Sequence, residues 1–519
     1  MIGRSPGCRA SRAGARALLA TTALGAAVCS FGAAPALAAT QQEGENLRRE
    51  IESFLTDPGW PGYSFEHGPV TVEVVGDGYN LLIPDLVVVF DQPADQVIYG
   101  EPRHLRISLD DLNLRVEPDP VDLDSFGIQA RLGGGSLFGT GAEPLRVVIE
   151  SNNGVRAFVD VGRHELAGTW SSEVGYLTAS SLSLQDIVAT PDPAVPGAPD
   201  ARFTIGAVRA VSAVTEGAPG LWDGTAEIVI DNVAVENEGE VPLRVDQVTV
   251  NQSFADFAFQ QYMDWVRTSP AMLGEQPDFA TEEEAQAFIH EQFANFPTLF
   301  DGFSFGWTVT GLDAGEANER VRIDSHEFGL AVSGLSGDLS EWTLRLFAEG
   351  MSIPAPEVPQ QLVPTVFDLN LRFTDVPTGL GWQAMEAALL DGQVGNTGAL
   401  GPVLEQQLVQ LALQSQTGAN LEGSIDWQTG RVEISGEVHA DPTSPVMASG
   451  GLRIVVSEMQ EFIREVESAL GTDAAGGLTM VQALGQQEGN STVYDFRISG
   501  SSVLMNGQDM QPLMMLLNQ

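Results

Sequence analysis

Apolar and polar side chains alternate with a period of two over much of this chain, and this pattern most limits how it can fold. Val70, Val72 and Val74 alternate with polar neighbours, and Phe303, Phe305, Trp307 and Val309 repeat the pattern. Successive side chains of a strand point to opposite faces, so each run predicts a strand with one apolar face. Short spacing and glycine turns favour an antiparallel meander over parallel strands joined by helices.

The alternation changes parity at one place that the fold must accommodate. Leu105, Ile107 and Leu109 occupy odd positions, whereas Leu112, Leu114 and Val116 occupy even ones. A bulge or turn at Asp110 and Asp111 would keep both sets facing one core.

Several shorter stretches have helical spacing instead. Leu47, Ile51, Phe54 and Leu55 predict a helix at the start, which ends before Pro58. Capping boxes at Thr281 with Glu284, and at Ser457 with Gln460, predict two more helix starts. Further helices are predicted from Phe254, Phe257, Ala258 and Trp265, from Leu380, Ala384, Met385, Ala388 and Leu389, and from Leu404, Leu408 and Leu411. The expected fold class is α+β, strand-dominated, with large curved antiparallel sheets and packed helices.

The chain also carries an internal echo at an offset of 118 residues. Residues 202–205 match 320–323, 225–229 match 343–347, and 231–235 match 349–353, all without a gap. A duplicated unit of strands and a helix would give this echo, although strand alternation alone also produces such matches.

These patterns predict a division of the chain at composition changes and turns. Pro191, Pro193, Pro196 and Pro199 mark a linker. The expected parts are a signal peptide (1–38), an N-terminal antiparallel β region with a leading helix (39–189), the linker (190–200), a first strand-plus-helix unit (201–300), a second such unit (301–400) and a C-terminal α+β region (401–519).

The N-terminus has the features of an export signal. Four arginines up to Arg16 precede an apolar run, and Ala36 and Ala38 supply the small residues of a cleavage site. We therefore expect cleavage after Ala38 and a periplasmic location. The alternative is an uncleaved anchor, for which the run is weak because it is rich in Ala and Gly and contains Pro35. No later stretch is apolar enough to span a membrane, so no transmembrane segment is expected in the mature chain.

Both cysteines, Cys8 and Cys29, lie in this leading segment. Lipidation of Cys29 usually requires a small residue before it and Leu three positions earlier, but Val28 and Ala26 occupy those positions. A mature chain cleaved after Ala38 has no disulfide and no thiol nucleophile.

The charge balance is strongly acidic. The 519 residues include 70 acidic residues and 25 basic ones, giving a net charge of −45, and every basic residue is Arg. The negative electrostatic potential of such a chain repels phosphate backbones, so nucleic acid is excluded as a non-specific partner. Acidic surfaces suit saline surroundings, where salt screens self-repulsion; recognition of cations or of a basic partner is the alternative.

No motif for a metal, cofactor or nucleophile is found. The six histidines have no metal-ligand spacing. Asp122 and Asp124 begin like a calcium loop, but Phe126 takes the place of its third ligand. Lysine is absent, which excludes Schiff-base chemistry, and the chain has no nucleophile-elbow motif. We predict no catalytic, cofactor-binding or metal site, although a looser calcium site elsewhere stays open.

Aromatic side chains gather in one part of the chain. Two interpretations are open, a core between helix and strands or a surface for an apolar, chain-like ligand. The candidate ligand surface consists of Trp265, Phe288, Phe293, Phe296, Phe303, Phe305 and Trp307.

The sequence resembles the exported alphaproteobacterial proteins catalogued as domain of unknown function 2125. Gly62-Tyr63, the run from Val70 to Glu73, Gly76-Asp77, the run from Leu82 to Val88, and the late strand before Asn506-Gly507 carry the resemblance. It implies an envelope protein without an established activity and transfers no catalytic residue. At the level of the fold, the plan is also similar to large periplasmic lipid-handling proteins.

Three functions are compatible with these observations. The first is a non-enzymatic binding or envelope-maintenance protein that holds a lipid or another apolar ligand. The second is a hydrolase of envelope glycans that uses two carboxylates, which needs one raised pKa in a cleft. The third is a purely structural protein. Protein partners are not indicated by any motif.

Overall fold

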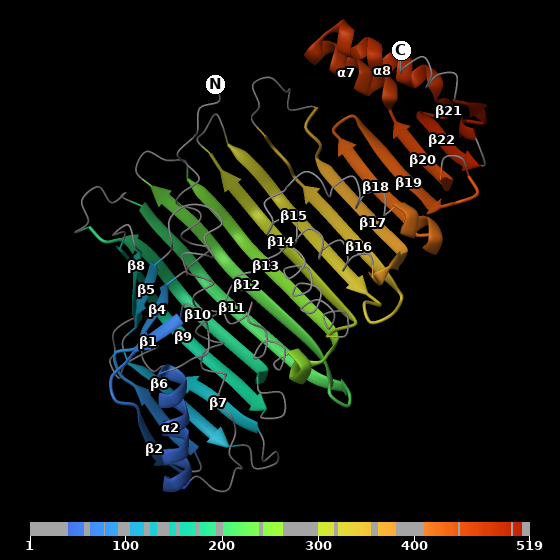
Figure 1. Ribbon diagram of the computed structural model, residues 1–519. Helices are drawn as coiled ribbons and strands as arrows, with labels where there is room; N and C mark the ends of the chain where they lie inside the picture. The colour runs from blue at the N-terminus through green and yellow to red at the C-terminus, as the bar shows by residue number, and fades with distance from the viewer. Residues whose placement is uncertain are drawn as a thin grey trace, which may run out of the picture. The chain divides into compact units, whose positions relative to one another are not determined.

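A computed structural model describes the chain as two compact units (Figure 1). Unit 1 comprises Met1–Thr249 and Ala258–Asp278, and unit 2 comprises Val250–Phe257 and Phe279–Gln519. The described residues are 40–56, 63–76, 78–91, 104–109, 111–118, 125–131, 145–151, 156–171, 176–193, 201–237, 242–262, 299–315, 320–353, 362–379, 409–444, 447–499 and 502–510. As predicted, the architecture is strand-dominated, with antiparallel sheets and few helices.

Unit 1 begins with the predicted helix, α2 (Gln41–Thr56). Its i, i+4 spacing puts Ile51 and Leu55 on one face, and both are buried. On its other side, Arg48 pairs with Glu45 and Glu52 at helical spacing. The amphipathic pattern therefore predicts both the helix and the face that it buries.

The strands after α2 form two short ladders. One joins β2 (Thr71–Val75), β3 (Gly78–Ile83), β6 (Leu112–Pro118) and β7 (Ser125–Arg131). The other joins β1 (Tyr63–Glu66), β4 (Val87–Asp91), β5 (His104–Ser108) and β8 (Leu145–Ser151). After β1, the chain thus runs through the ladders in consecutive pairs: β2 and β3 lie in the first, β4 and β5 in the second, and β6 and β7 in the first again, before β8 completes the second.

The two ladders meet at a single long strand, β9 (Arg156–Ser171). The first part of β9 pairs with β8, where Leu145 opposes Val161. Its last part pairs with β7, where Arg131 opposes Glu165. On its other side β9 pairs along its length with β10 (Tyr176–Pro191). The sheet therefore forks at β9.

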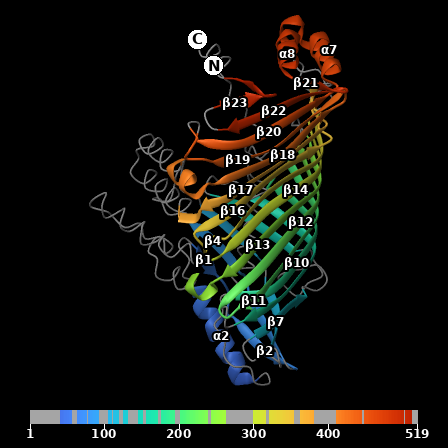
Figure 2. The same cartoon turned by 90° about the vertical axis from the view of Figure 1, so that its right-hand side faces the viewer.

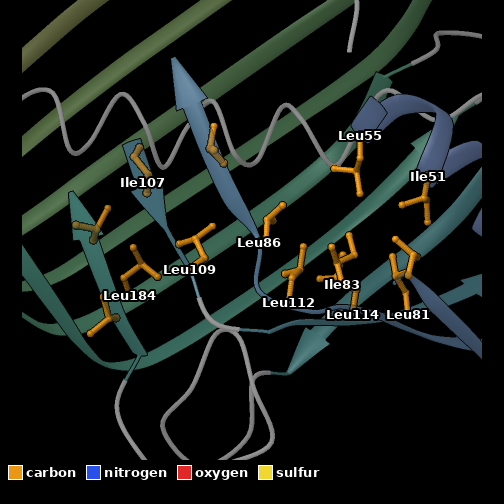
Figure 3. Close-up of a cluster of buried hydrophobic side chains, with 14 of the residues drawn as sticks. Ile51, Leu55, Leu81, Ile83, Leu86, Ile107, Leu109, Leu112, Leu114 and Leu184 are labelled. Atoms are coloured by element: carbon orange, nitrogen blue, oxygen red, sulfur yellow. The ribbon is translucent and has the colours of Figure 1, made fainter. Parts of the chain in front are cut away.

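The main core of unit 1 fills this fork (Figure 3). Ile51 and Leu55 of α2 pack in one core with Leu81, Leu112 and Leu114 of the first ladder, and the same core includes Ile107 of the second. The chain crosses between the ladders at Asp111, whose carboxylate accepts a hydrogen bond from the Asp85 backbone amide at 3.2 Å. Leu109 and Leu112 are both buried in this core, which confirms the prediction of one core on both sides of the parity change.

Beyond β9, unit 1 continues as a stack of antiparallel hairpins. β10 pairs with β11 (Ala201–Ala218), and β11 pairs with β12 (Leu221–Asn237). Asp186 in β10 and Asn232 in β12 have left-handed backbone, with φ of 54° and 55°. Gly162 lies against the Asp186 side chain, and Gly206 lies against that of Asn232.

These residues form what we call the kink row, which consists of Gly162, Asp186, Gly206 and Asn232 on four adjacent strands. The kink row resets the side-chain alternation in every strand that it crosses. Leu184 and Ile187 are both buried although they are three residues apart, and Ile205 and Val208 repeat this. Apolar residues on both sides of the kink row therefore share one face.

Unit 2 is a second run of antiparallel strands, which lie side by side in chain order in Figures 1 and 2. Each strand pairs with the next, and β20 pairs with β22. The strands are β14 (Gly302–Ala314), β15 (Val321–Ser333), β16 (Leu339–Glu349), β17 (Val366–Pro377), β18 (Gly418–Trp427), β19 (Gly430–Ala440), β20 (Ala448–Ser457) and β22 (Ser491–Ser499). Three short strands, β21 (Gln486–Glu488), β23 (Ser502–Met505) and β24 (Gln508–Asp509), finish it.

The predicted starting positions of two helices need correction. The prediction of a helix at Phe254 and Phe257 was wrong, because β13 (Leu243–Phe257) extends through both residues. Asp256 has left-handed backbone with φ of 52°, and the Phe254 and Phe257 rings lie 5.2 Å apart. A left-handed residue in a strand thus gives the i, i+3 spacing that is also typical of a helix. The other predicted helices of this region, from residues 281–297 and 380–389, lie outside the described residues.

The second correction concerns the helix pair near the C-terminus. α7 (Met459–Leu470) and α8 (Thr472–Leu484) follow β20. The predicted capping box at Ser457 was wrong, because Ser457 ends β20 and its hydroxyl hydrogen-bonds Ser491 at 3.2 Å. Glu458 takes the cap position with left-handed backbone and makes no side-chain capping bond. The left-handed turn at Glu458 thus ends β20 and starts α7.

The 118-residue echo coincides with the pairing register. In β11 and β12, Thr215 opposes Asp223 and Ala207 opposes Asp231. In β15 and β16, Ser333 opposes Glu341 and Ser325 opposes Glu349, which are the same positions moved by 118. The left-handed Asn232 likewise corresponds to the left-handed Gly350. This match supports the proposed duplication of the hairpin.

Candidate binding surface

The aromatic residues of β14 belong to a surface that extends across unit 2. Residues opposite one another in an antiparallel pair share a face of the sheet. Phe305 opposes Leu330, and Trp307 opposes Phe328. Following each register to the next strand gives a row of side chains on one face, and most of its members are apolar.

We define the apolar face by the two central rows. The first row consists of Phe305, Leu330, Leu344, Leu371, Leu421, Gly436, Leu452 and Phe496. The second row consists of Trp307, Phe328, Leu346, Leu369, Gly423, Ile434, Ile454 and Tyr494. Rows that begin at Phe303 and at Val309 flank them. Most of these side chains are half-buried rather than fully buried, in contrast to the core of unit 1.

Aromatic contacts order the β14 end of the apolar face. The Trp307 and Phe328 rings stack with centroids 4.2 Å apart, and Phe305 meets Trp307 edge-on at 5.6 Å. Phe300 links Phe257 and Phe303 at 6.3 and 6.1 Å. Contacts between aromatic rings add to the stabilisation from buried area, so this end of the apolar face is held together by its own side chains.

The opposite face of the same strands is polar. Arg345 pairs with Glu327 at 3.3 Å, and Arg372 pairs with Glu341 at 2.7 Å. The hydrogen bond that the Arg372 guanidinium donates to the Glu341 carboxylate raises the pKa of Arg372. Arg453 pairs with Glu488 at 3.0 Å. The strict alternation thus gives unit 2 one charged face and one apolar face.

The helix pair adjoins the apolar face at its β22 end. Phe462 of α7 lies against Trp427 at 5.1 Å, and the Thr429 hydroxyl donates to Glu465 at 2.6 Å. The Tyr494 hydroxyl donates to the Val481 carbonyl of α8 at 2.9 Å. Burial beneath α8 raises the pKa of Tyr494. Helix α8 therefore rests on one member of the apolar face.

The structure brings together only part of the predicted ligand surface. Phe303, Phe305 and Trp307 share one face of β14, as predicted. Trp265, Phe288, Phe293 and Phe296 lie outside the described residues. The leucines and isoleucines of β16 to β20 were missed, although their alternation in the sequence was a usable signal. What the sequence lacks is the register that aligns them into rows.

No catalytic arrangement is found in the described part of the chain. It contains no group of three potential metal-ligating side chains. The segment from Ser333 to Gly337 is a turn, in which the Ser336 hydroxyl donates to the Asp301 carboxylate. The acidic residues 119–124 lie outside the described residues.

No family model, no curated protein and no solved structure matches this chain. Among the described helices, none has the length and apolar character needed to cross a bilayer.

Proposed function

We propose that this protein is a non-enzymatic exported binding protein that holds a chain-like apolar ligand, such as the acyl chains of a lipid, on the apolar face. The supporting observation is the pair of continuous rows from Phe305 and Trp307 to β22. Large side chains in these rows keep part of their surface accessible. Covering such a surface with a hydrocarbon chain is favourable at about 25 cal/mol per Å² removed from water.

A periplasmic location is part of this proposal. The arginines, apolar run and Ala36–Ala38 pattern at the N-terminus support export. A carrier or holder of lipid in that compartment needs no cofactor, and none is proposed.

The alternative, a hydrolase of envelope glycans, has less support. A general acid of this kind needs a carboxyl group with a raised pKa. Hydrogen bonds lower the pKa of Glu66, through Arg106, and that of Asp441, through Thr443. Neither Glu66 nor Asp441 is therefore a candidate for the general acid of such a hydrolase.

Native mass spectrometry of the mature protein, purified from its own periplasm in high salt, tests the proposal. We expect a mass above that of the polypeptide, and an extract of the same sample should contain lipid in about stoichiometric amount. A polypeptide mass without adduct and an extract without lipid would contradict the proposal. High salt is used because it screens the self-repulsion of this strongly acidic chain, whose 70 acidic residues far outnumber its basic ones.

A charged residue on the apolar face should abolish ligand retention. Leu371→Glu places a carboxylate between Leu344 and Leu421, where burial beside hydrocarbon is strongly unfavourable for a charge. We expect the lipid recovered per protein to fall at least about tenfold. The matched control is Thr343→Glu, which lies on the polar face next to Arg372 and should retain the lipid. Equal retention by both variants, with unchanged circular dichroism, would contradict the assignment of the face.

A further inference from the structure

The most exposed large apolar side chain in the described residues lies on α8. Met480 is 73% exposed, and Val481 and Leu484 are each 46% exposed. At helical spacing these three residues lie on one side of α8. On the other side, Ala475 is buried, and Leu478 and Gln482 are half-buried. The helix therefore has one packed side and one apolar side in water.

This side of α8 is also without charge. Residues 474–487 contain no Asp, Glu, Lys or Arg, although 18% of the whole chain is charged. A surface helix that only faces water normally carries polar and charged residues on its outer side. Exposed apolar patches mark sites of interaction with proteins or membranes.

We propose that the outer side of α8, formed by Met480, Val481 and Leu484, is a docking site for the surface of a lipid bilayer. Insertion of these side chains among lipid headgroups removes them from water without burying a charge. Basic residues are absent from the patch, so the attraction is apolar and not directed at anionic lipids.

A second copy of the chain fits this patch less well. α8 has 13 residues and is therefore about 20 Å long, because a helix rises 1.5 Å per residue. One face of such a helix offers roughly 200–300 Å², whereas a stable dimer usually buries about 800 Å² on each partner. A bilayer imposes no such minimum, since a few inserted side chains give a reversible contact.

The inner side of α8 connects this docking site with the apolar face. Tyr494, a member of the apolar face, donates its hydrogen bond to the Val481 carbonyl at 2.9 Å. Asn506 donates from its side-chain amide to the Leu484 carbonyl at 3.1 Å, which holds the end of α8 in place. A bilayer in contact with α8 would thus lie next to the β22 end of the apolar face. This last step rests on the proposed function; the docking itself does not.

Flotation of the full mature protein with unilamellar vesicles tests the inference. We expect the protein to float with phosphatidylcholine vesicles. Without the four arginines of residues 1–38, 21 basic residues stand against 70 acidic ones, a net charge of −49. This charge should oppose binding to phosphatidylglycerol vesicles at low salt, and 0.5 M salt, where the Debye length is only about 4 Å, should largely restore it. The triple variant Met480→Ser, Val481→Ser, Leu484→Ser should bind phosphatidylcholine vesicles at least about tenfold more weakly.

The control is Met447→Ser, because Met447 is 54% exposed on another part of unit 2; it should float like the parent. Absence of flotation of the parent, or equal flotation of the triple variant, would overturn the inference. A dimer that the triple variant loses would overturn it in favour of a second copy. The lipid content of the triple variant, measured separately, reports on the apolar face, so failure of docking and failure of ligand binding are distinguishable.

Discussion

Replacing Leu114 with Ala is expected to lower the free energy of unfolding of unit 1 by about 2–5 kcal/mol. Leu114 is 1% exposed and belongs to the core that fills the fork between the two ladders. The substitution removes apolar burial and leaves a cavity among residues from α2 and both ladders, which cannot all move inward together. Urea unfolding followed by far-ultraviolet circular dichroism measures the effect.

The matched control is Val211→Ala in β11. Val211 is 54% exposed, and a surface substitution of this kind should change stability by no more than about 0.5 kcal/mol. A loss at Leu114 no larger than the loss at Val211 would mean that the fork does not enclose a cooperative core.

Gly450→Ala is expected to destabilise unit 2 by about 2–5 kcal/mol. Gly450 has φ of 141°, which L-residues rarely adopt. A Cβ at this position would clash with the Glu437 carbonyl oxygen and would lie 2.7 Å from the Val438 Cα. Both atoms belong to the backbone of β19, so relief requires that β19 and β20 separate. Thermal unfolding followed by circular dichroism measures the loss.

Two other glycines separate the causes of this effect. Gly489 has φ of 65° with nothing near its missing Cβ, so Gly489→Ala should cost only about 1–2 kcal/mol of backbone strain. Gly477 lies in α8 with open space around it, and Gly477→Ala should stabilise by up to about 1 kcal/mol. If Gly450→Ala costs no more than Gly489→Ala, the close approach of β19 and β20 has no energetic consequence.

Alternation in the sequence was sufficient to predict several strands. The alternating runs from Val70 and from Phe303 correspond to β2 (Thr71–Val75) and β14 (Gly302–Ala314). Strand alternation is a local property, so a single sequence contains it. The predicted leading helix is confirmed for the same reason.

Left-handed residues inside strands could not be predicted in this way. Phe254 and Phe257 share a face because Asp256 between them is left-handed, and the resulting spacing equals that of a helix. In β9 the alternation resets at Gly162, which lies against the left-handed Asp186 of β10. Asp and Asn adopt left-handed backbone more readily than most residues, but their presence in the sequence does not show which of them interrupts a strand.

The apolar face was only partly predictable. The alternating residues Phe303, Phe305, Trp307 and Val309 predicted the β14 end of the apolar face. Leu371 and Leu421, in contrast, are ordinary strand residues when each is considered alone. Their alignment follows from β17 and β18 pairing in one particular register. A one-residue shift in that register would place every such side chain on the charged face.

The fork at β9 has a consequence for the order in which unit 1 folds. β9, β10, β11 and β12 pair as successive hairpins, and contacts between sequence neighbours close quickly because little chain entropy is lost. The fork instead pairs strands that skip one another, such as β3 with β6 and β5 with β8. We expect the backbone amides of the hairpins to gain protection from hydrogen exchange before those of the fork during folding.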